Sequence, residues 1–111
     1  MFGPFVHKLN KGGLDDIVAN GRLLSTTAAG TAGGGDGVRA HQGSFQDLYR
    51  FHGWAVRPDP NEIFIEFKTA HQPLVVGPPH RHSMVRWLLD AGQYLLITIT
   101  GVYNGCGQRL S

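Results

Sequence analysis

The chain has few cysteines, few charged residues and no long apolar run, and each of these absences excludes a class of protein or site. Cys106 is the only cysteine among 111 residues, which excludes an intramolecular disulfide and zinc sites built from two or more cysteines. Charged residues make up 16% of the chain, below the roughly 25% of average globular domains. No apolar run approaches the roughly 18 residues of a membrane span, and Met1–Val6 lacks the charged start and long apolar core of a signal peptide. We therefore expect a fold stabilised by packing, without a membrane span.

A basic run is also absent. The 10 Lys and Arg residues exceed the 8 Asp and Glu residues only slightly and are dispersed along the chain. A domain that binds DNA usually concentrates its positive charge in a run or on one helix. The 6 histidines can add positive charge in mildly acidic surroundings or near phosphates. This distribution favours a cleft with a few cations, and DNA is not expected as a partner.

The residues that are present are enough for one modest core. Hydrophobic residues make up 41% of the chain, and single domains typically have about 100–150 residues. We therefore expect one domain over residues 1–111. Its one low-complexity stretch, residues 26–37, alternates glycine, alanine and threonine and is predicted to be a glycine-rich loop.

Hydrophobic periodicity predicts a mixed fold. Leu14, Ile17 and Val18 are spaced to share one face of a helix over Gly13–Gly21, and Ser83–Ala91 is predicted to form a further short helix. Phe45–Phe51 suits either a short helix or a turn-rich segment. The sum predicts an α+β domain with a small, mainly antiparallel twisted sheet, one N-terminal helix and one further short helix. The predicted strands are Phe5–Leu9, Val38–His41, Ile63–Thr69, Pro73–Gly77 at an edge, and Tyr94–Val102.

Several familiar catalytic and binding motifs are missing. Gly33–Gly37 lacks the spacing of the nucleotide-binding glycine motifs. His80 and His82 offer two metal ligands without further donors beside them, so no metal site is expected. Ser44 lacks the glycines that flank the nucleophile of many serine hydrolases.

A set of side chains suited to cleaving RNA without a metal remains. Such cleavage needs a base for the 2′-hydroxyl proton, an acid for the leaving 5′-oxygen, and donors that stabilise the phosphate. We predict that His7 and His41 share the acid and base roles and that the other residues of the set hold the phosphate. The candidates are His7, Arg39, His41, Lys68, Thr98 and Thr100.

Each candidate also has an ordinary structural role that the sequence leaves open. His7 suits a core histidine bonded to the backbone, and Arg39 suits a surface ion pair. Lysine at a strand end is usually solvated, and threonine is a common strand former. Among the other residues, Trp54 and Trp87 are predicted to lie in the core, and His52, His71 and His82 in loops or on the surface.

Several segments resemble known toxin domains. The stretch Phe5–Ser25, with its first-strand histidine and its ending Asn20-Gly21-Arg22-Leu23-Leu24-Ser25, resembles ADP-ribosyltransferase-like domains. Gly37–His41, Ile65–Pro73 and Ile97–Gly105 look like C-terminal toxin domains of bacterial polymorphic toxin systems of the contact-dependent or Rhs type. The resemblance implies a domain delivered as part of a larger secreted bacterial toxin. It would act in the cytoplasm of the target cell and be held in check by a cognate immunity protein.

Two chemistries are implied by this resemblance. One is a metal-independent ribonuclease similar to the barnase, EndoU, colicin and RelE group, with a His, a cation and a Ser or Thr on a sheet face. The other is NAD-dependent ADP-ribosyl transfer, in which His7 would hold the nicotinamide ribose and Ser25 and Tyr49 would also contact NAD. A transferase would also use a late acidic residue. No Asp or Glu follows Asp90, which leaves Gln108 or the earlier Glu66 as substitutes.

This absence favours the ribonuclease. We therefore expect an endoribonuclease toxin domain that uses no cofactor and takes RNA as its substrate. The ADP-ribosyltransferase is the alternative, and a non-enzymatic module that binds a protein partner is a second alternative.

Overall fold

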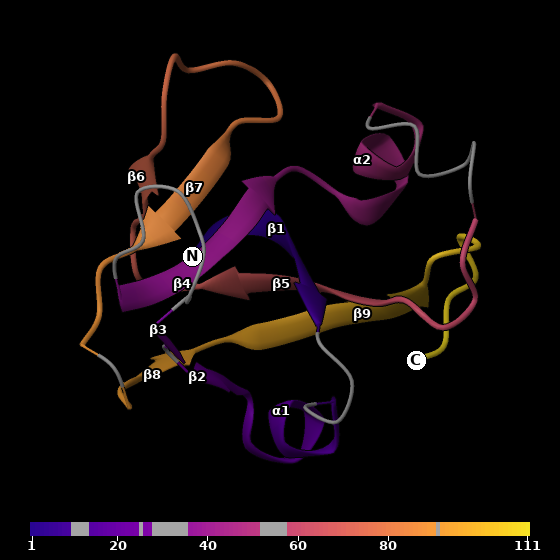
Figure 1. Cartoon of the computed structure of the whole chain (residues 1–111), viewed down its shortest axis with the longest axis horizontal. Helices are drawn as coiled ribbons and strands as arrows, with labels where there is room; N and C mark the ends of the chain where they lie inside the picture. The colour runs from indigo at the N-terminus through magenta and orange to yellow at the C-terminus, as the bar shows by residue number, and fades with distance from the viewer. Residues whose placement is uncertain (10–13, 25, 28–35, 52–57, 91) are drawn as a thin grey trace.

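The computed structural model describes residues 1–9, 14–24, 26–27, 36–51, 58–90 and 92–111, with a seven-stranded sheet as its main feature (Figure 1). Its elements are β1 Phe2–Leu9, α1 Leu14–Asn20, β2 Arg22–Leu24, β3 Thr26–Thr27, β4 Asp36–Gln42, α2 Phe45–Phe51, β5 Ile63–Thr69, β6 Leu74–Val75, β7 Met84–Trp87, β8 Tyr94–Leu96 and β9 Thr98–Asn104. The sheet has the order β6-β7-β4-β1-β5-β9, with β3 paired to β4, and β2 and β8 form a separate small sheet. Every pairing between described strands is antiparallel, so the predicted α+β class with a mainly antiparallel sheet is confirmed.

The two faces of the large sheet carry separate apolar clusters. Side chains alternate along a strand, so Phe5 and Val6 of β1 point to opposite faces. Phe5 belongs to the larger cluster, to which α1 and the small sheet contribute, and we name this side the α1 face. Val6 belongs to the smaller cluster, together with residues of α2, and we name this side the α2 face. Figure 1 shows α1 and α2 at opposite sides of the sheet.

The predicted second short helix at Ser83–Ala91 is wrong, because its centre forms the strand β7. Val85 and Trp87 are buried while Arg86 between them is partly exposed, which is the period of a strand. The apolar positions of this segment fit both periods, and pairing of β7 with β4 and β6 selects the strand. The second helix of the fold is α2 at Phe45–Phe51, where the sequence allowed either a helix or turns.

The N-terminal helix is confirmed, with one correction to its buried face. Ile17 is buried, but Val18 is 52% exposed and does not share that face. Gly21 follows the helix with a φ of 60°, and its N–H donates to the Ile17 carbonyl at 2.8 Å, which ends the helix.

The predicted loop over residues 26–37 is strand at both ends. Thr26 and Thr27 of β3 pair with Gly37 and Asp36 of β4, and residues 28–35 between them lie outside the described residues. Gly37 has a φ of 147°, and a Cβ on it would lie 2.3 Å from the Trp87 carbonyl oxygen. This close approach of two backbones requires glycine.

The predicted last strand, Tyr94–Val102, is divided into β8 and β9. Ile97 separates them and donates its N–H to the Gly21 carbonyl at 2.8 Å. The alternation expected of a strand is present at this end, because Leu95 and Ile97 are buried while Leu96 is exposed. The chain therefore passes from the small sheet at β8 to the large sheet at β9 while buried and exposed side chains continue to alternate.

The remaining structural predictions have mixed outcomes. Trp87 lies in the core as predicted, and His71 is exposed. His82 lies in the turn before β7, as predicted for a loop residue, but it is only 5% exposed, with its ring centroid 4.4 Å from that of Phe51. His52 and Trp54 lie outside the described residues. No helix in the described ranges is long and apolar enough to cross a membrane.

Candidate functional site

His7 is a partly buried side chain of β1 with one fixed hydrogen bond. Its Nδ1 lies 2.6 Å from the carbonyl oxygen of Arg39 on β4, so Nδ1–H donates and Nε2 is left as the acceptor. Burial lowers the pKa of His7 below its ordinary 6.5, and the bond to Arg39 opposes this only in part. The imidazole is therefore neutral at pH 7, and its bond to the backbone fits the structural role that the sequence left open.

The predicted pairing of His7 with His41 as acid and base is wrong, because the two side chains lie on opposite faces of the sheet. Val6 is the direct cross-strand partner of His41, so both share the α2 face. His7 follows Val6 and points to the α1 face. A single phosphate cannot contact both imidazoles through the sheet.

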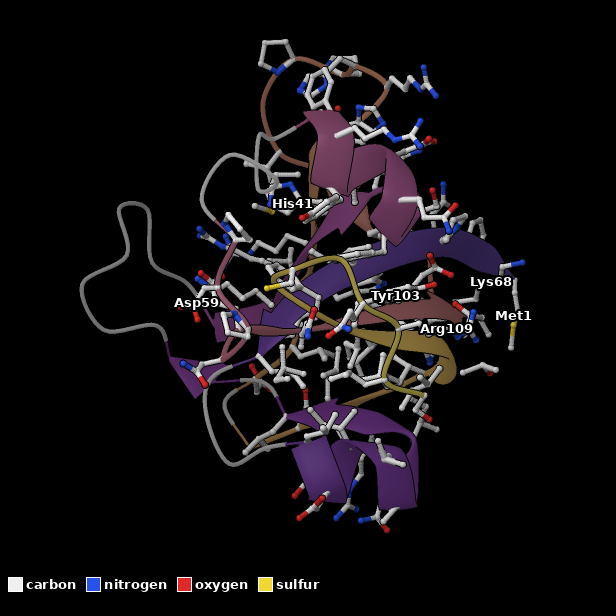
Figure 2. All side chains as sticks on the ribbon, turned by 90° about the vertical axis from the view of Figure 1, so that its right-hand side faces the viewer. Met1, His41, Asp59, Lys68, Tyr103 and Arg109 are labelled. Carbon is white, nitrogen blue, oxygen red and sulfur yellow. The ribbon has the colours of Figure 1, made fainter. Side chains whose placement is uncertain are left out.

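Five of the six candidate residues lie on the α2 face, in two groups. Arg39 and His41 are two residues apart on β4 and form one group. Lys68, Thr98 and Thr100 come from β5 and β9 and form the other. Figure 2 shows His41 and Lys68 far apart across this view, with Tyr103 and Arg109 nearer to Lys68.

A carboxylate that sequence reasoning did not place in the ribonuclease site organises the second group. Glu66 of β5 accepts two hydrogen bonds, from the Thr100 hydroxyl to Oε1 at 2.8 Å and from the Phe45 N–H to Oε2 at 2.9 Å. Phe45 begins α2, so the same carboxylate ties the helix to the sheet. A carboxylate has about four lone-pair positions. Acceptor capacity is therefore left on both oxygens.

Two cations lie near the residues that surround this carboxylate. Lys68 is exposed, lies two residues from Glu66 on the same face, and pairs across the strands with the exposed Thr98. Two residues along a strand span roughly 7 Å. Arg109 is exposed and donates from Nη2 to the Thr100 carbonyl at 3.0 Å. We name this group the Glu66 cluster; its members are Glu66, Lys68, Thr98, Thr100 and Arg109.

The cluster offers the parts of metal-free phosphate chemistry. Glu66 is a fixed proton acceptor, Lys68 is a proton donor with three N–H groups, and Arg109 adds a planar set of donors. The signal that could have found Glu66 is its position two residues before Lys68 in an alternating strand. Arg109 had no such signal, because the chain returns to Thr100 only through the bend after β9.

The residues expected to bind NAD do not come together. Tyr49 of α2 packs on Phe45, with ring centroids 5.6 Å apart, on the face opposite His7. Glu66 is also on that opposite face, and Gln108 accepts a hydrogen bond from Asn104 Nδ2 at 3.0 Å. Ser25 lies outside the described residues. Glu66 is therefore not placed beside His7 on the α1 face, and Gln108 is bonded to Asn104 at the end of β9.

Within the described ranges, no group of three or more His, Cys, Asp or Glu side chains could hold a metal ion. Comparisons with protein-family models, with curated proteins and with solved structures found no match.

Proposed function

We propose that the chain is a metal-independent endoribonuclease whose catalytic centre is the Glu66 cluster. The observation that carries the proposal is the fixed Glu66 carboxylate, with Lys68 two residues along β5 and Arg109 bonded to the Thr100 carbonyl. These groups supply a base, an acid and an anion-binding donor set without a metal. His7, Arg39 and His41 are left out of this centre because of their places in the sheet.

The reaction is an internal transesterification. Glu66 takes the proton of the ribose 2′-hydroxyl, and the 2′-oxygen forms a bond to the neighbouring phosphorus. The bond from phosphorus to the 5′-oxygen breaks, and the Lys68 ammonium gives that oxygen a proton. The products are a 2′,3′-cyclic phosphate end and a 5′-hydroxyl end.

The other members of the cluster stabilise this reaction. Arg109 and Thr98 donate hydrogen bonds to the phosphate oxygens as negative charge develops on them. Thr100 is a positioning residue, because its hydroxyl hydrogen is used on Glu66. The full setting of the proposal follows the resemblance: a domain of a larger secreted bacterial toxin, active in the target-cell cytoplasm and neutralised by an immunity protein.

One observation favours the alternative, ADP-ribosyl transfer. His7 is neutral, and its Nε2 is able to accept a hydrogen bond from a ribose hydroxyl. The transferase also needs a group that stabilises a cationic sugar, and Glu66 is on the other face of the sheet. The ribonuclease is preferred for this reason.

The test is to incubate the purified domain with total bacterial RNA in EDTA, with and without labelled NAD, and to resolve the products on a denaturing gel. We expect fragments with 2′,3′-cyclic phosphate ends without NAD. Lys68→Met keeps the alkyl stem and removes the proton, so we expect a loss of rate of about 10²- to 10⁴-fold. Lys8→Met is the matched control, because Lys8 is an exposed strand lysine paired with Glu62 at 3.0 Å.

Each other outcome has a definite meaning. Label transferred from NAD, with RNA of intact length, would replace the ribonuclease with the transferase. If neither cleavage nor transfer occurs, the non-enzymatic binding module replaces both enzymes as the proposed function. Equal rates for Lys68→Met and Lys8→Met would reject the Glu66 cluster as the catalytic centre.

A further inference from the structure

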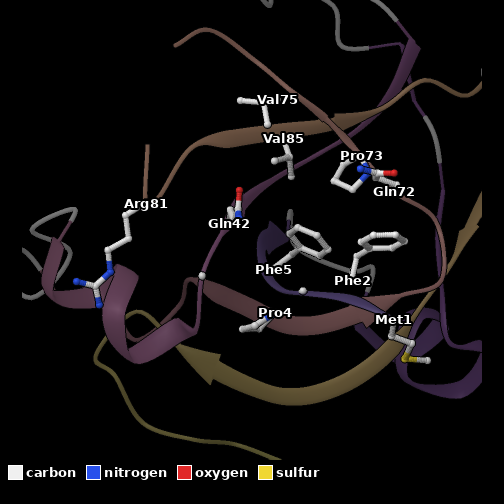
Figure 3. A pocket seen from close by; sticks show the side chains of 12 residues that line it. Met1, Phe2, Pro4, Phe5, Gln42, Gln72, Pro73, Val75, Arg81 and Val85 are labelled. Atoms are coloured by element: carbon white, nitrogen blue, oxygen red, sulfur yellow. The ribbon is translucent and has the colours of Figure 1, made fainter. Parts of the chain in front are cut away.

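A cleft of about 500 Å³ has no part in the proposed reaction. It lies between the start of β1, the end of β4, and the β6–β7 side of the sheet. In the view of Figure 3 the rings of Phe2 and Phe5 lie side by side in it, with Gln42 on one side and Gln72 and Pro73 above Phe2. Small-molecule sites typically have volumes of about 300–1,000 Å³. The cleft is therefore large enough for one planar heterocycle.

The lining combines an aromatic surface with amide groups. Phe5 is 3% exposed and belongs to the core, whereas Phe2 is 42% exposed and offers its ring to a ligand. Gln42 and Gln72 are exposed, and each side chain carries both hydrogen-bond donors and acceptors. Pro73, Val75 and Val85 add apolar surface. None of the described lining side chains is acidic.

Positive charge is present at two places along the cleft. A Cβ on Gly3, a lining residue, would lie 3.1 Å from Cγ of Lys68, so the Lys68 stem packs directly behind the cleft. Arg81 also lines the cleft, and its guanidinium contacts the Asp47 carboxylate at 3.3 Å. The aromatic and amide lining thus lies between two cations, Lys68 and Arg81. A ligand with a flat polar ring between two phosphates matches this arrangement better than a neutral or cationic ligand.

We propose that this cleft is the nucleobase subsite of the RNA substrate. Phe2 and Gln42 face the α1 side and Lys68 faces the α2 side, and Phe2 and Lys68 lie at the adjoining ends of β1 and β5. The base stacks on Phe2, the amides of Gln42 and Gln72 bind its polar edge, and the neighbouring phosphate reaches Lys68 around these strand ends. Stacking on an aromatic side chain is tolerant of base identity, so the two amides set the base preference. This inference rests on the proposed function, because it assigns the base next to the phosphate that is cleaved.

The test measures binding apart from cleavage. The probes are the four ribonucleoside 3′-monophosphates and ribose 5-phosphate, which has no base, titrated into the whole chain and followed by NMR shifts. We expect at least one nucleotide to bind 10-fold more tightly than ribose 5-phosphate. Phe2→Ala should weaken that nucleotide about 5- to 100-fold, because stacking contributes roughly 1–3 kcal/mol per base. Gln42→Ala and Gln72→Ala should change the ranking of the four nucleotides.

The controls separate this subsite from other sites and from catalysis. Phe51→Ala removes an aromatic ring of α2 that is 59% exposed and does not line the cleft, so it should leave nucleotide binding unchanged. Equal binding of nucleotides and ribose 5-phosphate, or of Phe2→Ala and the unaltered chain, would overturn the subsite. Base-dependent binding without RNA cleavage would retain the subsite and reject the ribonuclease. Cleavage without base-dependent binding would retain the ribonuclease and reject the subsite.

Discussion

Glu66→Gln tests whether the Glu66 carboxylate is a base or only a link between helix and sheet. The glutamine oxygen can accept the Phe45 N–H, and its amide can donate to the Thr100 hydroxyl oxygen, which reverses one of the two bonds. Both contacts are kept, and they change from charged to neutral. Hydrogen bonds to charged groups contribute about 1.5–3 kcal/mol and neutral ones about 0.5–1.5 kcal/mol. We therefore expect the free energy of unfolding to fall by about 1–3 kcal/mol.

The effect on RNA cleavage should be far larger than the effect on stability. An amide cannot take the 2′-hydroxyl proton, so the cleavage rate should fall about 10²- to 10⁴-fold. The assay pairs urea denaturation with cleavage of a fluorescent oligoribonucleotide in EDTA. Glu62→Gln is the control, because Glu62 is a partly exposed carboxylate that forms an ion pair with Lys8, and such pairs contribute about 0–1 kcal/mol. A folded Glu66→Gln variant that cleaves at nearly the full rate would refute the assignment of Glu66 as the base.

Two further predictions concern His7 and Gly37. Burial lowers the pKa of His7 in the folded protein. As pH falls below 6.5, His7 therefore binds its proton in the unfolded chain before it does so in the folded one. The free energy of unfolding should decrease there by up to about 1.4 kcal/mol per pH unit. His7→Asn keeps a donor for the Arg39 carbonyl and should remove this part of the slope in denaturation at pH 5 to 7, and an unchanged slope would contradict it. Gly37→Ala should destabilise the fold by about 2–4 kcal/mol, because its Cβ would meet the Trp87 carbonyl at 2.3 Å. Gly77→Ala also has a positive φ but open space around it, so its loss in thermal denaturation should be only about 1 kcal/mol, and equal losses would reject the clash.

The sequence predicted local patterns well and relations between strands poorly. The period of Ile63–Thr69 and the stop at Gly21 depend on a few neighbouring residues, and the structure agrees with both. The strand β7 was mistaken for a helix because its apolar spacing fits both periods, and only its two neighbours in the sheet decide. Short segments with such spacing therefore need tertiary information.

The error on His7 and His41 has the same origin. Each residue is in a correctly predicted strand. Whether the two side chains share a face, however, depends on the register between β1 and β4. A shift of one residue exchanges the faces of a whole strand. The pairing of Val6 with His41 fixes this register, and no local feature of either segment indicates it.

An irregularity in the register of β5 and β9 lies next to the contact of Thr100 with Glu66. Glu66 pairs with Gly101, whereas Phe67 pairs with Ile99, so β9 has one extra residue, Thr100, opposite this step. In an unbroken strand Thr100 and Gly101 would point to opposite faces. Thr100 keeps the α2 face of Thr98, from which its hydroxyl bonds Glu66, and the bulge brings Gly101 and Tyr103 to the same face.

The space for this arrangement is provided by the residue after the bulge. A Cβ on Gly101 would lie 2.6 Å from the Tyr103 ring, so glycine lets this ring lie close against the strand. Tyr103 in turn stacks on Phe45, with ring centroids 4.2 Å apart, and Phe45 donates its N–H to Glu66. Bulges beside functional sites commonly redirect a side chain in this way. The bulge thus brings Tyr103, and with it the α2 cluster, to the face on which Thr100 and Phe45 hold the Glu66 carboxylate.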